Sequence, residues 1–378
     1  MSRTNDWMEI NMYIIGVLLA AAGVIFRRPK ILGIASFYVL GLLSAYSNPL
    51  YNPDYSVYSG YYTLAGQGVN TTYFEQIYMR LGILAYDHGL SYMGFRLAMV
   101  MIFTTVLIFG ILRFTDNVAF VALSYALTSF FINDVQIRNF FMLTIVVVAF
   151  SVLKKITVKR LIIALALIYV SAGFHSVAYV FLFTLVFLLF RDTKTGIYVV
   201  STVVVFIQLI MVFAGKELLL SAITTALSRV TQRINLAEKI SQQFITGPSY
   251  VYILLSWVMV FASIMFVLFV LEHEKDSVLL TENQVLIYAF LTATLGLPMM
   301  MYATDYTRII RNSFFFLYLF AAIIFKDKNL EVTSFYKKVM WLVVIIASAV
   351  GQNVVWGPAF VNDIPHLAHF FNGLKILQ

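Results

Sequence analysis

Three arginines stand where the chain enters apolar, helix-forming sequence. Arg138 precedes the apolar run 139–153. Arg308 and Arg311 precede the run 312–325 and, being three residues apart, share one helical face. An ionisable side chain at membrane depth costs at least ~2.5–3.5 kcal/mol when it has no partner, so its presence there indicates function. A guanidinium is a planar fork of donors that binds phosphate through two hydrogen bonds. We therefore expect an anionic ligand, and phosphate or diphosphate fits best.

Two carboxylates and two tyrosines lie in the polar stretch before these arginines. Asp54 and Tyr58 share a face if a helix starts with Asp54 as its N-cap. Glu75 is the only acid in the segment 74–84, which is amphipathic and too short to span a membrane. Desolvation raises the pKa of such a carboxylate, so either acid is a candidate general base. Tyr58 and Tyr78 suit either a membrane-interface belt or a sugar-binding path.

His175 lies in a run, 161–190, that contains no Asp, Glu, Lys or Arg. Lysines and arginines flank the run on both sides, so the tendency of basic residues to stay cytoplasmic places both of its ends inside. We therefore predict a hairpin of two short helices that turns near 173–176, with His175 near the outer face. A single histidine without a second ligand either caps the turn or contributes a hydrogen bond, and we expect no metal site.

The composition places these residues in a membrane protein. The chain has 378 residues, of which 61% are hydrophobic and 12% charged, whereas soluble domains have roughly 25% charged residues. It has no cysteine, which excludes disulfides, thiolate metal sites and cysteine nucleophiles. It has no glycine-rich phosphate loop, so we expect neither a nucleotide energy source nor a cofactor. The formal charge of +8 is then a signal of orientation, and no nucleic-acid partner is expected.

We predict an all-α polytopic membrane protein, with residues 1–378 forming one integral membrane domain of about twelve helices, some of them short or broken. The predicted spans are 10–26, 31–46, 92–112, 117–133, 139–153, 161–173, 176–190, 196–214, 249–271, 285–303, 312–325 and 339–356. The basic cluster 27–30 places the first turn in the cytoplasm and, with it, both termini outside. Two larger loops, 47–91 and 215–248, and the tail 357–378 are then extracytoplasmic.

The two sides of this topology differ in the kind of basic residue they carry. Ten of the fifteen inner basic residues are lysines, whereas eight of the eleven outer ones are arginines. The outer arginines are Arg3, Arg80, Arg96, Arg138, Arg229, Arg233, Arg308 and Arg311. For most of them, contacts with lipid headgroups or with outer carboxylates are a sufficient explanation. The excess of arginine nevertheless favours an anionic substrate on the outer face.

With these elements placed, the chain resembles the EpsG family, the Wzy-type polymerases of exopolysaccharide, capsule and O-antigen synthesis. The resemblance covers roughly residues 40 to 315. The residues that carry it are Asp54, Tyr58, Glu75, Tyr78, Arg138, the sequence Phe174-His175-Ser176, and Arg308.

The resemblance implies a membrane glycosyltransferase with a GT-C-like fold in the bacterial plasma (inner) membrane. Such an enzyme transfers the glycan of one polyprenyl-diphosphate-linked oligosaccharide to the next repeat unit and releases polyprenyl diphosphate. Its partners would be the lipid bilayer, a chain-length regulator and a flippase. It also implies residue roles. Those on the diphosphate would be Arg138, Arg308, Arg311 and His175. Either Glu75 or Asp54 would be the base, and Tyr58 and Tyr78 would line the sugar path.

Two other functions compete with the polymerase. An O-antigen-ligase-like transferase would use the same lipid donor with a different acceptor, and the sequence hardly separates the two. A lipid-linked glycan transporter would show paired inverted halves and charges near the membrane midplane. No such halves are visible in the sequence, and the charges gather at the outer ends of the spans.

Overall fold

The computed structural model describes residues 2–47, 49, 52–69, 73–190, 192–213, 250–274, 277–301, 304–325 and 332–355. Within these ranges the chain is helical and has no strand. The helices up to the middle of the chain are α1 (Ser2–Ile25), α2 (Pro29–Ala45), α3 (Tyr55–Gly66), α4 (Gln76–Asp87), α5 (Tyr92–Leu112), α6 (Val118–Thr128), α7 (Phe130–Val135), α8 (Ile137–Val152), α9 (Val158–Ala172), η1 (Ser176–Phe181), α10 (Leu182–Phe187) and α11 (Thr193–Phe213). Those that follow are α14 (Tyr250–His273), α15 (Ser277–Glu282), α16 (Gln284–Leu291), α17 (Ala293–Met299), η2 (Thr304–Tyr306), α18 (Thr307–Ile324), α19 (Val332–Ala349) and the π-helical η3 (Val350–Val355).

Each predicted span coincides with a helix or with a broken pair of helices. Five of the described helices are long and apolar enough to cross a membrane: Tyr92–Leu112, Thr193–Ile210, Val251–His273, Thr307–Ile324 and Ser334–Asn353. The others are shorter, so the number twelve stays a prediction. The predicted loop 215–248 and tail 357–378 lie outside the described residues.

Several predicted helix limits need correction. The span 117–133 is interrupted at Ser129, and 285–303 is interrupted at Thr292. The second arm of the predicted hairpin begins as the 3₁₀ helix η1, which winds more tightly than an α-helix and is stable only in short pieces. Helix α18 begins at Thr307 instead of 312, so Arg308 and Arg311 lie inside the helix and face its neighbours.

Helices α8 and α18 form the interior of the molecule. Almost every side chain of both is buried, because α18 packs against α6, α8, α16 and α17, and α8 also packs against α5 and α9. After their polar first turns both helices are mostly apolar, as expected for helices in such a position. The helices around this interior expose large apolar side chains, as at Leu18 in α1, Tyr169 in α9 and Phe206 in α11. Exposed apolar faces of this extent suit contact with lipid.

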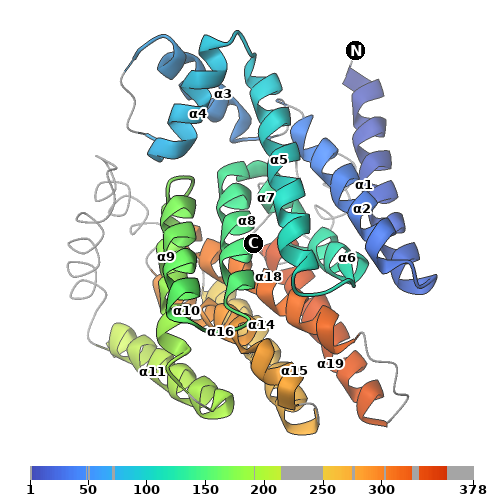
Figure 1. The fold of residues 1–378 in the computed structure, drawn as a ribbon, viewed down its shortest axis with the longest axis vertical. Coiled ribbons are helices and arrows are strands. Elements are labelled where there is room, and N and C mark those ends of the chain that lie inside the picture. The colour runs from blue at the N-terminus through green and yellow to red at the C-terminus, as the bar shows by residue number, and fades with distance from the viewer. Residues whose placement is uncertain are drawn as a thin grey trace.

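Helices α3 and α4 lie together at one end of the molecule, the end at which α1 begins and α5 begins (Figure 1). Helix α8 runs away from this end and α9 returns toward it, so the turn between α9 and η1 lies near α4. The turn between α1 and α2, which carries the basic cluster 27–30, lies at the far end of α1, away from α3 and α4. The first predicted outer loop is therefore a helical cap over the end where Arg138 opens α8.

Candidate functional site

Glu75 and Arg138 form an ion pair between the cap and the helical interior, across 63 residues of sequence. Their side chains are 10% and 6% exposed. Glu75 is the N-cap residue of α4 and Arg138 lies in the first turn of α8. The second carboxylate oxygen, Oε1, accepts a hydrogen bond of 3.1 Å from the backbone N–H of Ser176. One carboxylate thus joins α4, α8 and the start of η1, and both contacts favour its ionised form.

The start of α4 is docked directly on the turn after α9. The backbone N–H groups of Ile77 and Tyr78 donate to the carbonyl of Gly173 at 3.1 and 3.2 Å. A Cβ atom on Gly173 would lie 2.3 Å from Cδ1 of Ile77, so only glycine fits at this approach. The contact carries Glu75 to Ser176 and brings His175 close to the same carboxylate.

Aromatic rings surround the guanidinium of Arg138. Its Cζ lies 4.0 Å from the centre of the Phe74 ring, 5.4 Å from that of Tyr58 and 5.8 Å from that of Tyr78. Distances below about 6 Å allow an attraction between the cation and the ring faces. These rings fix the position of the guanidinium in addition to the ion pair.

His175 and Arg308 form the neighbouring part of the site. Nη1 of Arg308 lies 3.1 Å from Nε2 of His175, and Nη2 donates to Oδ1 of Asp305 at 3.1 Å. Because arginine can only donate, Nε2 is the acceptor in this contact, while the other ring nitrogen, Nδ1, lies 3.3 Å from the backbone N–H of Val177. Arg308 is 18% exposed and Asp305 36%, so this pair lies nearer the surface than Arg138 does.

Arg311 lies one turn deeper in α18 and is 2% exposed. In the described part of the chain its guanidinium donates to the side-chain carbonyl of Gln136 and not to a carboxylate. Asn139 follows Arg138 in α8, and Asn312 follows Arg311 in α18. Their side-chain amides exchange two hydrogen bonds of 2.8 Å. A reciprocal amide pair in an apolar interior fixes the register between helices. It therefore sets α18, with its two arginines, against α8, with Arg138.

Asp54 is the N-cap residue of α3, as predicted, but its side chain does not cap the helix. Its backbone N–H donates to Oδ1 of Asn52 at 3.1 Å. One turn later, burial raises the pKa of the Tyr58 phenol, the charge of Asp54 adds to the increase, and that of Arg138 opposes it. Tyr58 thus keeps its proton and can donate a hydrogen bond. Asp54 is half-buried beside this phenol.

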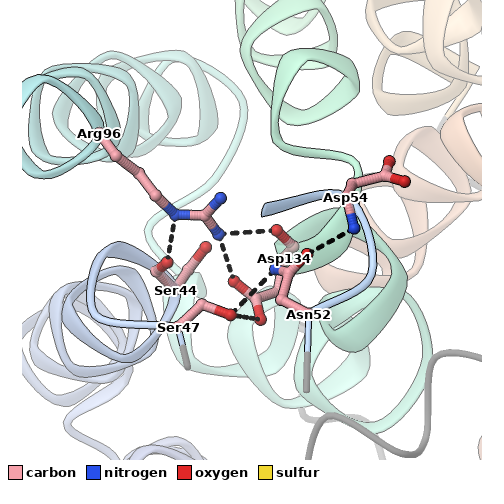
Figure 2. A network of polar contacts seen from close by, with 6 residues as sticks. All are labelled: Ser44, Ser47, Asn52, Asp54, Arg96 and Asp134. Atoms are coloured by element: carbon pink, nitrogen blue, oxygen red, sulfur yellow. Dashed lines mark hydrogen bonds and ion pairs between the residues drawn. The ribbon is translucent and has the colours of Figure 1, made fainter. Parts of the chain in front are cut away.

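A second buried ion pair lies beneath Asp54. Nη2 of Arg96 lies 2.9 Å from Oδ1 of Asp134, and Ser47 donates to the other oxygen of this carboxylate at 3.0 Å. Asn52 donates to Ser47 at 2.9 Å and also accepts from Asp54 N–H. Figure 2 shows this chain of contacts and the Asp54 carboxylate pointing away from it. The network ties the segment before α3 to α5 and α7, and so fixes where Asp54 stands.

The structure brings the predicted site residues to one end of the molecule. Four of them form two contacts, Glu75 with Arg138 and His175 with Arg308. The others are Tyr58 and Tyr78 at Arg138, Asp54 beside Tyr58, and Arg311 one helical turn deeper.

Sequence reasoning missed the residues that support this site: Phe74, Arg96, Asp134, Gln136, Asn139, Ser176 and Asn312. It classed Arg96 and Asp134 with ordinary loop charges. Both stand at the ends of apolar runs, as Arg138 does, so the same criterion of membrane depth could have found them. Among the described residues, no group of three or more His, Asp or Glu could hold a metal ion. The clustered arginines suit an anion.

Comparison with known proteins agrees with the resemblance seen in the sequence. The model of the EpsG family matches residues 30–357, which is most of the chain. No curated protein and no solved structure matches the chain significantly.

Proposed function

Because this chain belongs to the EpsG family, a family of Wzy-type polymerases, we propose that it joins polyprenyl-diphosphate-linked oligosaccharide repeat units at the outer face of the bacterial plasma membrane. Family membership points to a glycosyltransferase-like polymerase in the membrane. The observation that carries the finer proposal is that Glu75 and Ser176 link Arg138 to the contact between His175 and Arg308 under the helical cap. The two arginines and the histidine come from three separate segments and suit a diphosphate.

In the proposed reaction, a hydroxyl oxygen of the acceptor sugar bonds to the anomeric carbon of the donor glycan. The bond between that carbon and the diphosphate oxygen breaks, and polyprenyl diphosphate leaves with the bonding electrons. Arg138 and Arg308 stabilise the negative charge that develops on the leaving group, and Arg311 adds its charge from one turn deeper. His175 holds Arg308 through Nε2 and would have to release it to donate a hydrogen bond to the same oxygens itself.

The proton of the acceptor hydroxyl passes to a carboxylate, for which Glu75 and Asp54 are the two candidates. Asp54 lies beside Tyr58, whose retained proton can hydrogen-bond to a sugar. Glu75 is paired with Arg138 in the structure, which favours its ionised form and weakens it as a base. Tyr58 and Tyr78 line the path of the acceptor.

The test is reconstitution of the purified protein with lipid-linked repeat units and no nucleotide. A ladder of products supports the polymerase. A single transfer to a different acceptor would instead establish a ligase-like transferase. Movement of the lipid-linked glycan across vesicles without bond formation would establish a transporter and overturn the proposal.

A further inference from the structure

The Glu75 carboxylate makes the contacts that a phosphate group would make at this site. Its two oxygens accept from the guanidinium of Arg138 and from the backbone N–H of Ser176. A phosphate group binds to the same two kinds of donor through two of its oxygens, and each phosphate of a lipid-linked diphosphate carries one negative charge, as the carboxylate does. Glu75, a candidate base, is therefore bound to Arg138, the residue proposed to bind the diphosphate of the substrate.

The contacts of the three arginines leave one donor of each unused. The Nε atoms of Arg138, Arg308 and Arg311 are each buried without a hydrogen-bond partner among the described residues. Buried donors are ordinarily satisfied in a folded protein, so each unsatisfied one calls for an explanation. A ligand with more acceptor oxygens than one carboxylate would satisfy them.

Helix α4 and Arg138 each have other contacts that hold them in position. The second and third backbone N–H groups of α4, which an N-cap side chain would normally satisfy, donate to Gly173 instead. The ring of Phe74, with those of Tyr58 and Tyr78, holds the guanidinium of Arg138. The carboxylate can therefore leave while both of its neighbours stay in place.

We propose that Glu75 holds the place of a substrate phosphate on Arg138, that the diphosphate displaces it, and that the displaced carboxylate becomes the base. This inference rests on the proposed function. Without its positive partner the carboxylate is a stronger base, and it takes the proton of the acceptor hydroxyl as the new glycosidic bond forms. Once the proton passes to water, Glu75 is charged again and competes with polyprenyl diphosphate for Arg138, which promotes product release.

The alternative is that Glu75 only positions Arg138, and the two roles predict opposite changes in affinity. If Glu75 competes with the ligand, Glu75→Gln frees Arg138 and tightens binding. If Glu75 positions Arg138, the same substitution disorders the guanidinium and weakens binding.

The experiment measures the affinity of inorganic pyrophosphate for the purified full-length protein by calorimetry in detergent. We expect Glu75→Gln to bind it about three- to tenfold more tightly than the natural protein. In the natural protein, only the fraction of molecules in which Arg138 is not paired with Glu75 can bind pyrophosphate, and this lowers the apparent affinity. The same variant should lose turnover on lipid-linked repeat units by about a hundredfold. Asp87→Asn removes one exposed carboxylate from α4 and is the control for net charge, with no change expected in either measurement.

Unchanged or weaker binding by Glu75→Gln would overturn the exchange. If the natural protein still forms a product ladder, the polymerase proposal survives that result. If neither protein binds pyrophosphate and no ladder forms, both proposals fail. Should Glu75→Gln not fold, Glu75→Asp serves in its place: its shorter carboxylate competes less well, so a smaller tightening is expected, and no tightening overturns the inference.

Discussion

At the scale of single residues, the three arginines of the site differ in what holds them. Arg138 has a carboxylate and three aromatic rings, Arg308 has a carboxylate and an imidazole, and Arg311 has an amide. The three side chains carry the same charge, so charge alone does not explain why their surroundings differ. A planar guanidinium suits a position where one group must lie against aromatic rings and still donate through its edge.

We expect Arg138→Lys to lower polymerisation by about a hundredfold, although it keeps the positive charge. The lysine ammonium lacks the planar fork that lies against the Phe74 ring and donates to two oxygens of a diphosphate at once. The measurement is the initial rate of product-ladder formation with purified lipid-linked repeat units. Arg80→Lys makes the same replacement at an exposed position of α4 and should change the rate little. Activity retained in Arg138→Lys would refute a paired contact with the diphosphate.

At the scale of elements, the site depends on the docking of α4 against the turn between α9 and η1. Both halves of this contact were expected as local features: a short amphipathic segment over 74–84 and a turn near 173–176. Their meeting could not be predicted from the sequence, because about a hundred residues separate them and no periodic pattern encodes which turn a helix end approaches. The close fit at Gly173 is a property of the folded chain.

Gly173→Ala tests this docking. The added Cβ would collide with Ile77, so α4 must shift away from the turn and Glu75 must move away from Ser176. We expect polymerisation to fall about tenfold or more, since small displacements of positioning groups are costly in catalysis. Gly60→Ala is the matched control, because its Cβ would have no neighbour within 4 Å and alanine favours the helix α3. Equal activity of the two variants would contradict a positional role for the contact.

The network around Arg96 and Asp134 is the second device that holds elements together. We expect Arg96→Ala to lower the free energy of unfolding by about 3–5 kcal/mol, because it leaves the Asp134 carboxylate buried without its positive partner. Thermal unfolding in detergent measures this loss. Replacing both partners, Arg96→Met with Asp134→Leu, should recover most of it. If the single replacement is as stable as the natural protein, the pair does not hold α3 in place.

At the scale of the whole molecule, the sequence predicted the helical class, the approximate positions of the apolar helices and the family. The first two follow from composition and from charges between apolar runs, which act locally, whereas the family follows from the residues that carry the resemblance. The breaks at Ser129 and Thr292 were missed, since a polar residue inside an apolar run is compatible with a continuous helix. The partner of each buried charge was missed as well, because pairing depends on which helix ends meet in space.

The sidedness of the molecule is the remaining global expectation, and the absence of cysteine makes it directly testable. A single cysteine at Gly60, in the cap that covers the site, should react in intact cells or right-side-out vesicles with a maleimide that cannot cross the membrane. A cysteine at Lys155, exposed between α8 and α9, should react only after the membrane is opened. This outcome follows if the cap and the lysine-rich turns lie on opposite sides, as the positive-inside rule requires. The reverse pattern would place the arginine site in the cytoplasm and remove the outer-face polymerase as a candidate, whatever the activity of the purified protein.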